Sequence, residues 1–329
     1  MHLQTQRDSV TGEPTGLGLV VREERPAGLR LEHVGGWKVR LRARDRVLLW
    51  AHPRLRLDGV WLLRGRGEAS PGILPPITAR EARATTEPMG WMKRFARALE
   101  RSAASPLGRG TWELSELVPS AGPHASCSAA RRGDARSARD PERGPPDAYG
   151  LRASLTLPHV WFEPWGVNGS LGVFPLRDAP SSETARLRAW RKHAREGTLP
   201  PVLLYWVGAL DMYLLVDGHI RLQAALEEDV SPCVIALWQP QVLRFEGADS
   251  WRSPLVEKYE RAFEHERQLT VETRRTLGRR LAAAFAEHRV PVTTARHRPG
   301  AEGAWNDEVR HELSDDPERC AAFLEGREG

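Results

Sequence analysis

The stretch VDGHIRLQAA, residues 216–225, takes the chain from a strand directly into a helix. The run YLLV before Asp217 is apolar in the manner of a buried strand, and the alanine-rich residues after Gly218 are typical of a helix. The first backbone N–H groups of a helix have no partner within it and lie at the positive end of its dipole. The stretch therefore predicts a place where an anion such as phosphate can bind.

Four residues of this junction suit a phosphate site. Gly218 has no Cβ, so a phosphate can approach the backbone closely. Arg221, in the first turn of the helix, can donate two charge-assisted hydrogen bonds to one anion. His219 can donate a hydrogen bond or exchange a proton near neutral pH, and Asp217 can hold His219, a ribose hydroxyl or a metal ion. An ordinary strand–helix turn with a capping aspartate fits the same residues equally well.

The flanking sequence predicts an α/β module around the junction. Short apolar runs are typical of buried strands, and Leu187, Trp190 and Ala194 recur at helical spacing. The predicted order is helix, strand, strand, helix, strand, over residues 182–197, 200–207, 212–217, 218–228 and 231–237.

This order, with the phrase over 215–225 and the step DVSPCVI over 229–235, resembles the ParB/sulfiredoxin superfamily. Members commonly have an apolar strand, a glycine–arginine turn, an alanine-rich helix and a further strand after a Val-Pro type step. Upstream, FPLR at 174–177 is similar to the family's proline–arginine box, and LPP at 199–201 is similar to the link into the next strand. The resemblance spans residues 174–237 of 329.

The resemblance implies a nucleotide-binding core. In the family the turn binds a nucleoside triphosphate: CTP in partition proteins, ATP in sulfiredoxins and related free-serine kinases. By position, Gly218 and Arg221 fall on the phosphate-binding residues, and Arg177 corresponds to the upstream arginine. His219 stands where sulfiredoxin has its reactive cysteine, which argues against that chemistry. No helix-turn-helix pattern follows, which argues against a chromosome-segregation clamp of the standard kind.

Composition bounds the class of protein. The 329 residues are 40% hydrophobic and 28% charged, which suffices for two domains. No apolar run reaches the roughly 18–20 residues that a membrane span needs. The first residues lack the apolar segment of a secretory signal, so we expect a cytoplasmic protein with no membrane partner. Three widely spaced cysteines predict neither a disulfide framework nor a zinc site.

Charge is distributed unevenly along the chain. The net charge is +5, but 44 of the 48 basic residues are arginine, as codon bias in a GC-rich genome produces, so it is weak evidence for a nucleic-acid partner. Residues 22–66 carry 12 basic and 5 acidic groups, whereas residues 301–329 carry 3 basic and 9 acidic groups. We expect the acidic end to contact the basic segment or to mask a basic surface.

The chain is predicted to have an α+β fold with four regions. These are a β-rich N-terminal region with a terminal helix over 1–118, a flexible linker over 119–148, the nucleotide-binding core over 149–250, and a helical tail with an acidic, partly disordered C-terminus over 251–329.

A basic stripe is expected within the first region. Lys38, Arg40, Arg42, Arg44 and Arg46 alternate with other residues, which predicts one strand with a basic face. A solvent-exposed face is the simpler interpretation, and an anion-binding stripe is the functional one.

Two hypotheses follow from these patterns. The first is a protein that forms a homodimer and binds CTP or ATP with Mg²⁺. It would act as a switch, NTPase, phosphotransferase or nuclease, together with DNA or a protein partner. In an enzyme of this kind, His219 and Asp217 would serve as base or metal ligand. The alternative is a catalytically silent module that binds DNA or protein through the arginine-rich face. An enzyme needs a carboxylate directed into the site, from Asp217, Glu227 or Glu228.

Overall fold

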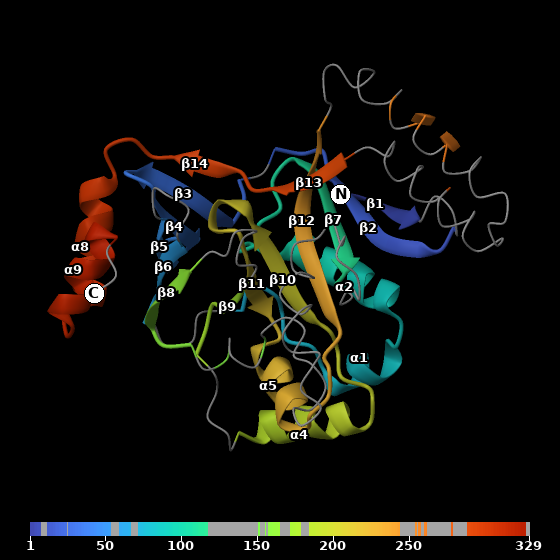
Figure 1. Ribbon diagram of the computed structural model, residues 1–329. Coiled ribbons are helices and arrows are strands. Elements are labelled where there is room, and N and C mark those ends of the chain that lie inside the picture. The colour runs from blue at the N-terminus through green and yellow to red at the C-terminus, as the bar shows by residue number, and fades with distance from the viewer. Residues whose placement is uncertain are drawn as a thin grey trace.

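The computed structural model describes residues 1–7, 12–24, 26–53, 59–66, 72–117, 157–164, 172–178, 184–243 and 288–326, with a few isolated positions between these segments. The described strands form two mixed sheets with helices packed on them (Figure 1). This arrangement confirms the expected α+β class. None of the described helices combines the length and apolar character required to cross a membrane.

Sheet A contains the strand–helix junction. Its strands lie in the spatial order β1 (His2–Arg7), β2 (Pro14–Val21), β7 (Gly110–Glu116), β12 (Val234–Leu243), β10 (Val202–Val207), β11 (Met212–Asp217) and β9 (Val173–Pro175). The second half of β12 also pairs with β13 (His288–Val292). Strand β10 is antiparallel to β11 and parallel to β12, and β11 is parallel to β9.

Sheet B lies beside sheet A (Figure 1). Its spatial order is β14 (Ala295–His297), β3 (Leu29–Gly35), β4 (Lys38–Ala43), β5 (Arg46–Pro53), β6 (Gly59–Arg64) and β8 (Val160–Pro164). The β3–β4 hairpin turns at Gly35-Gly36, as the glycine pair predicts, because both residues have positive φ angles of 113° and 53°. Strands β13 and β14 follow one another in the chain and connect the two sheets.

The predicted order of the central module is confirmed. Helix α4 (Ala185–Arg195), β10, β11, helix α5 (His219–Glu227) and β12 follow one another as expected. Every residue of β10 and five of the six in β11 are buried, because both strands lie inside the sheet and are covered on both faces.

The region boundaries expected from the sequence do not correspond to separate sheets. Strands β1, β2 and β7 come from the first 117 residues, yet they extend the sheet of the central module through the β7–β12 pair. Strands β3 to β6 from the same segment form most of sheet B. The linker over 119–148 lies outside the described residues, as does most of the helical segment expected over 255–289.

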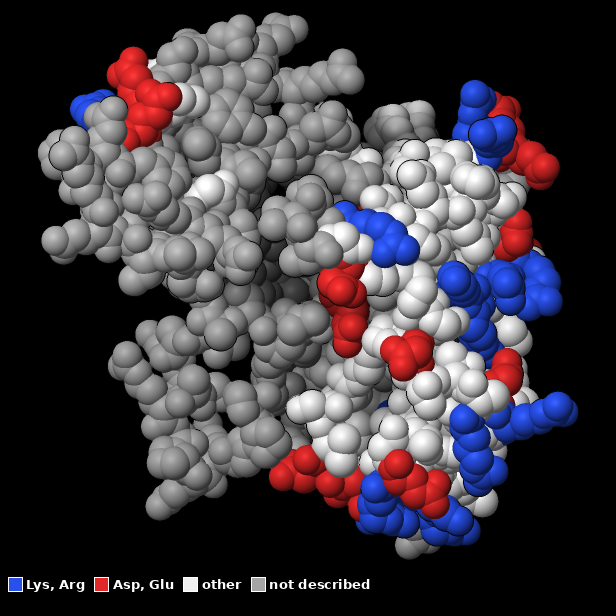
Figure 2. All heavy atoms as spheres, turned by 90° about the vertical axis from the view of Figure 1, so that its right-hand side faces the viewer, with Lys and Arg blue, Asp and Glu red and all other residues white. Residues whose placement is uncertain are grey.

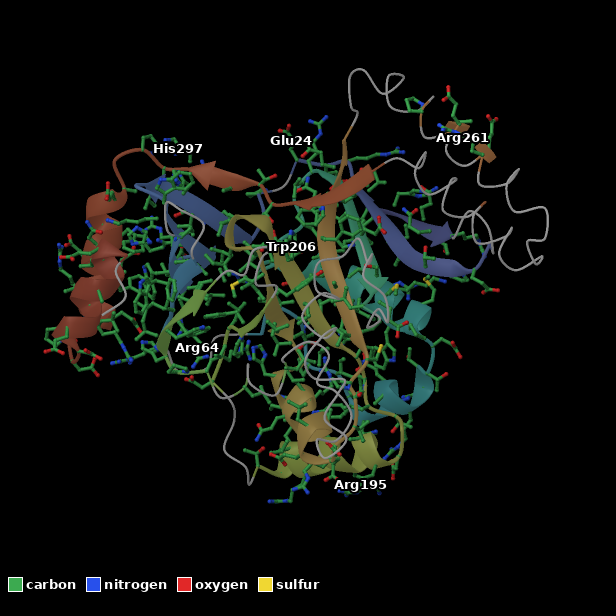
Figure 3. The ribbon with its side chains drawn as sticks, viewed as in Figure 1. Glu24, Arg64, Arg195, Trp206, Arg261 and His297 are labelled. Atoms are coloured by element: carbon green, nitrogen blue, oxygen red, sulfur yellow. The ribbon has the colours of Figure 1, made fainter. Side chains whose placement is uncertain are left out.

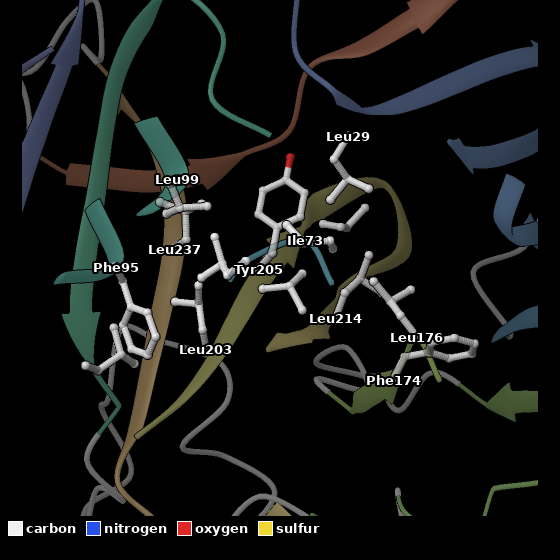
Figure 4. Close-up of a cluster of buried hydrophobic side chains, with 14 of the residues drawn as sticks. Leu29, Ile73, Phe95, Leu99, Phe174, Leu176, Leu203, Tyr205, Leu214 and Leu237 are labelled. Carbon is white, nitrogen blue, oxygen red and sulfur yellow. The ribbon is translucent and has the colours of Figure 1, made fainter. Parts of the chain in front are cut away.

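Two helices precede β7, and each begins at a local sequence signal. Helix α1 (Ala79–Ala84) has a complete capping box between Thr78 and Glu81. Helix α2 (Pro88–Arg101) begins at its proline and buries the apolar stripe that contains Phe95 and Leu99. Figure 4 shows this stripe within the core between α2 and sheet A, a core that also reaches Leu29 of sheet B.

The acidic C-terminal residues form two helices that cover the outer face of sheet B. Helices α8 (Glu302–Glu312) and α9 (Pro317–Glu325) run along this face (Figure 1). Ion pairs between described residues join the two regions: Lys38–Glu302 at 2.8 Å, Arg40–Glu308 at 2.6 Å, Arg42–Glu308 at 3.7 Å and Arg66–Asp315 at 2.8 Å. The predicted contact between the acidic end and the basic segment is therefore confirmed, and the expectation of partial disorder is wrong for residues 301–326.

The basic stripe differs from its prediction in two ways. Strand β4 ends at Ala43, Arg44 lies in a turn with φ 54°, and Arg46 opens β5, so the five residues do not share one strand. Lys38 and Arg40 are also 8% exposed rather than solvated, because α8 covers them. Their charges are matched by carboxylates of α8, a long-range pairing that period-two alternation does not reveal.

Candidate phosphate site at the start of helix α5

The junction between β11 and α5 is as abrupt as the sequence predicts. Asp217 is the last residue of β11, Gly218 is the N-cap, and α5 begins at His219. The amide N–H of Leu222 donates to the carbonyl of Gly218 at 2.7 Å, which closes the first turn. Among the described residues no side chain caps this helix, so its first N–H groups have no capping acceptor there.

Gly218 is required by the backbone and by the packing around it. Its φ angle is 100°, which side-chain-bearing residues rarely adopt. A Cβ at this position would lie 2.9 Å from Cγ1 of Val202 and 3.0 Å from Nη2 of Arg221. The space beside Gly218 is therefore filled by protein, and the glycine is explained by the turn rather than by the close approach of a phosphate.

We expect Gly218→Ala to destabilise the protein by about 2–4 kcal/mol, from the left-handed backbone and the contact with Val202 together. Urea unfolding at pH 7 measures the change. A Gly300→Ala variant is the control for backbone strain alone, because Gly300 has φ 76° and a methyl group there would meet nothing within 4 Å. Equal losses in the two variants would contradict the packing contribution.

Asp217 and Arg221 form an ion pair across the first turn. Nη2 of Arg221 donates to Oδ2 of Asp217 at 2.8 Å and to the carbonyl of Pro201 at 3.0 Å. The guanidinium also lies 6.0 Å from the ring of Trp190 on α4, within cation–π range. Burial alone would raise the pKa of Asp217, but the charge and hydrogen bond of Arg221 outweigh it and lower that pKa. Asp217 is thus ionised and engaged.

Three further arginines converge on this ion pair from distant parts of the chain. Arg64 ends β6, Arg94 lies on α2, and Arg177 follows β9. Their proximity is evident in the electrostatics: Arg177, Arg221 and Arg64 all lower the pKa of His219, and Arg94 lowers the pKa of Asp217. Burial in turn lowers the pKa of Arg64, Arg94 and Arg177.

These arginines are only partly matched by acceptors. Arg64 is 5% exposed, bonds Asp178 and the carbonyl of Pro175, and lies where sheet B meets β9 (Figure 3). Arg94 donates to the carbonyl of Pro75 at 3.3 Å and lies 3.5 Å from Glu81. Buried nitrogens without a hydrogen-bond partner among the described residues remain on three of the arginines: Nε of Arg64, Nη1 of Arg94 and Nε of Arg221.

Arg177 is the least engaged of the four arginines. It is half-buried, yet it forms no hydrogen bond or ion pair with any residue that the structure describes. Asp217 favours its charge, whereas Arg186 and Arg46 oppose it. The sequence therefore identified Arg177 and Arg221 as members of the group. It missed Arg64 and Arg94; the one signal available was an arginine that ends the apolar run VWLL of β6.

His219 lies within this positive environment. It is 8% exposed, and its Nε2 is buried without a hydrogen-bond partner among the described residues. Burial, reinforced by the charge of Arg177, lowers its pKa to about 3. A neutral imidazole can donate one hydrogen bond to an anion, but so weak a base accepts protons poorly at neutral pH. The environment favours a binding role over proton transfer.

This depressed pKa predicts a pH dependence of stability. Above pH 6.5, His219 is neutral in both the folded and the unfolded state and contributes nothing. Below pH 6.5 the unfolded chain takes up a proton that the folded protein does not bind, until about pH 3. Stability is therefore lost as the pH falls through this window, by up to about 1.4 kcal/mol per pH unit from this residue.

Urea unfolding between pH 7 and pH 4 compares the wild type with His219→Gln, which cannot titrate. We expect a flatter dependence on pH in the variant. His159, whose pKa burial lowers to about 4, is present in both proteins, so its contribution cancels in the comparison. Parallel curves would contradict the assignment of His219 as a buried neutral base.

The other predicted carboxylates lie away from the junction. Glu227 and Glu228 are at the opposite end of α5, where Glu228 accepts from Arg191 and from Arg195. Figure 3 shows Arg195 at the outer edge of the molecule, beneath the α4–α5 pair. At the start of α5, Asp217 is bound to Arg221. Among the described residues no group of His, Cys, Asp and Glu side chains is arranged to hold a metal ion.

No family model, curated protein or solved structure matches the chain.

Proposed function

We propose that the protein binds the phosphates of a nucleoside triphosphate, CTP or ATP, at the start of α5. One observation carries the proposal: four arginines gather around Asp217 and His219, and buried nitrogens of Arg64, Arg94 and Arg221 have no hydrogen-bond partner among the described residues. Buried donors without acceptors are costly, so we expect an anion to complete this group. A triphosphate supplies several negative charges and acceptor oxygens in a small volume.

The local backbone supports the same ligand. The uncapped first turn of α5 offers N–H groups and the positive end of the helix dipole. Neutral His219 adds a hydrogen-bond donor in the same turn. These features match the positions that the resemblance to the ParB/sulfiredoxin superfamily implies for Gly218, Arg221 and Arg177, although that resemblance itself stays a prediction.

Binding is better supported than catalysis. Phosphoryl transfer and hydrolysis need a group that positions or activates the nucleophile. Asp217 is held by Arg221, and Glu227 and Glu228 are bound at the far end of α5. We therefore propose a nucleotide-dependent switch, with Mg²⁺ carried by the triphosphate rather than by protein carboxylates. NTPase, phosphotransferase and nuclease activities, a DNA or protein partner, and a homodimer stay predictions.

Calorimetric titration of CTP, ATP and GTP with Mg²⁺ tests the proposal. We expect one of the first two to bind with a dissociation constant in the micromolar range, and Arg221→Ala to abolish the heat of binding. Phosphate release, measured on the same samples, is expected to be negligible. Absence of binding by folded wild-type protein contradicts the proposal. Rapid release of phosphate would mean that the protein is an NTPase and not only a nucleotide-dependent switch.

A further inference from the structure

A second positively charged site lies on the outer face of sheet B, far from α5. It is a groove of about 610 Å³ formed by β3, β4, β14 and the segment that leads into α8. It borders the start of α8, because Ala301, the N-cap of that helix, also lines it. The basic residues that line it are Arg30, Arg40, Arg42, Arg296, His297 and Arg298.

Strand pairing explains why these residues gather. Strand β14 adds to β3 in parallel, with Arg296 opposite Glu32. Side chains two residues apart share a face of a strand, so Arg296 and Arg298 join Arg30 on the face of Glu32. The contact of Arg298 with Glu32, at 3.4 Å, confirms this face. Two segments more than 250 residues apart in the sequence thus form one surface (Figure 3, in which His297 marks β14).

The acidic residues of the groove do not neutralise it. Glu32 is 2% exposed and forms ion pairs with Arg40, at 2.8 Å, and with Arg298. The other acidic lining residue, Asp45, accepts from Arg42 through its backbone carbonyl, and its carboxylate offsets one of the five lining arginines. Arg42 also lies 3.7 Å from Glu308 of α8. Two arginines then remain for a ligand.

Arg30 and Arg296 are these two residues. Nη2 of Arg30 donates a hydrogen bond to the carbonyl of Arg44 at 3.1 Å, but Nε of Arg30 is buried without a partner among the described residues. Arg296 is exposed and forms no hydrogen bond or ion pair within the described part of the chain. By contrast, Lys and Arg side chains are interspersed with Asp and Glu on the described part of the face in Figure 2.

We propose that this groove binds the phosphodiester backbone of a single-stranded nucleic acid. Arginine forks match phosphate oxygens, and Arg30 and Arg296 lie on neighbouring strands, two positions out of register on one face. The β3–β4 hairpin also presents Trp37, which is 56% exposed at its tip. Trp37 does not line the groove, but it lies at the tip of the hairpin whose two strands do. An exposed indole on a cationic surface can stack on unpaired bases, and an acidic peptide would not require such a ring.

Fluorescence anisotropy with a labelled 20-nucleotide oligothymidine tests the proposal. We expect micromolar binding that weakens with salt, and weaker binding of a duplex of the same length. Arg30→Gln/Arg296→Gln should reduce affinity at least roughly tenfold and lower the slope of log K against log salt by about 1.4, as the loss of two phosphate contacts requires. Trp37→Ala should reduce affinity roughly tenfold without changing that slope.

Two control variants separate this groove from the site at α5. Arg97→Gln removes an exposed charge from α2 and should leave oligonucleotide affinity unchanged. Arg177→Gln should also leave it unchanged; if this variant abolishes binding, the oligonucleotide occupies the α5 site and the groove proposal is overturned. Absence of binding by the wild type, unchanged affinity in the Arg30/Arg296 variant, or tighter binding of a polyglutamate peptide would each overturn it as well.

Discussion

Replacement of Arg177 by glutamine is expected to weaken nucleotide binding between about 10-fold and 100-fold while leaving the protein at least as stable as the wild type. The loss reflects a charge-assisted contact to phosphate, which contributes about 1.5–3 kcal/mol. Stability is retained because Arg177 has no hydrogen bond or ion pair with a described residue. Burial and the charges of Arg186 and Arg46 also outweigh the favourable charge of Asp217, so that the pKa of Arg177 is lowered. Functional sites typically contain residues that lower the stability of the free protein but strengthen ligand binding.

Calorimetry measures the affinity, and thermal unfolding without nucleotide measures the stability. The matched control is Arg319→Gln on α9, an exposed arginine whose removal should alter neither quantity. A clear fall in the melting temperature of Arg177→Gln would mean that Arg177 is structural. Unchanged affinity would remove it from the site. The variant is more informative than Arg221→Ala, because loss of Arg221 leaves Asp217 without its partner.

Trp305→Ala is expected to cost about 3–5 kcal/mol of stability, the range for a large buried aromatic side chain. The indole is fully buried, donates from Nε1 to the carbonyl of Val39 at 3.0 Å, and stacks on Phe323 with ring centroids 5.7 Å apart. Nζ of Lys38 lies 5.3 Å from the centre of its ring. Trp305 therefore joins α8, α9 and β4, and its loss should loosen both helices from sheet B.

Urea unfolding at pH 7 measures the change in stability. Trp37→Ala is the control, since that indole is 56% exposed and should change stability by less than about 0.5 kcal/mol. Helices α8 and α9 should also become more susceptible to proteolysis in the Trp305 variant. A loss below about 1 kcal/mol would contradict the view that the acidic end is an integral part of the fold, and would instead suit a displaceable cover over the basic face.

Local patterns in the sequence predicted local structure well. The order of helices and strands from α4 to β12 follows from short apolar runs and helical spacing, and the capping box at Thr78 determines where α1 begins. These signals lie within a few residues of the structure they specify. The abrupt turn at Gly218 is of the same kind, because the strand end, the glycine and the helix start are adjacent.

Long-range pairing could not be predicted in this way. Arg64 and Arg94 join Arg221 only because β6 and α2 pack against the module. The one local signal, an arginine at the end of the apolar run of β6, does not indicate which residues it meets. The interpretation of the basic stripe as a solvent-exposed face was wrong for Arg40 for the same reason, since the carboxylate of α8 that pairs with it lies at the other end of the chain. Likewise, the second groove exists only because β14 adds to β3.

The central claim is that the arginine group at the start of α5 binds the triphosphate. The most direct test is a crystal structure of the protein with Mg²⁺ and with whichever of CTP and ATP binds more tightly. We predict triphosphate oxygens at the first turn of α5, within hydrogen-bond distance of Arg177 and Arg221, with Nε2 of His219 donating to one of them. A triphosphate bound elsewhere, such as in the groove of sheet B, would contradict the assignment of this arginine group as the nucleotide site.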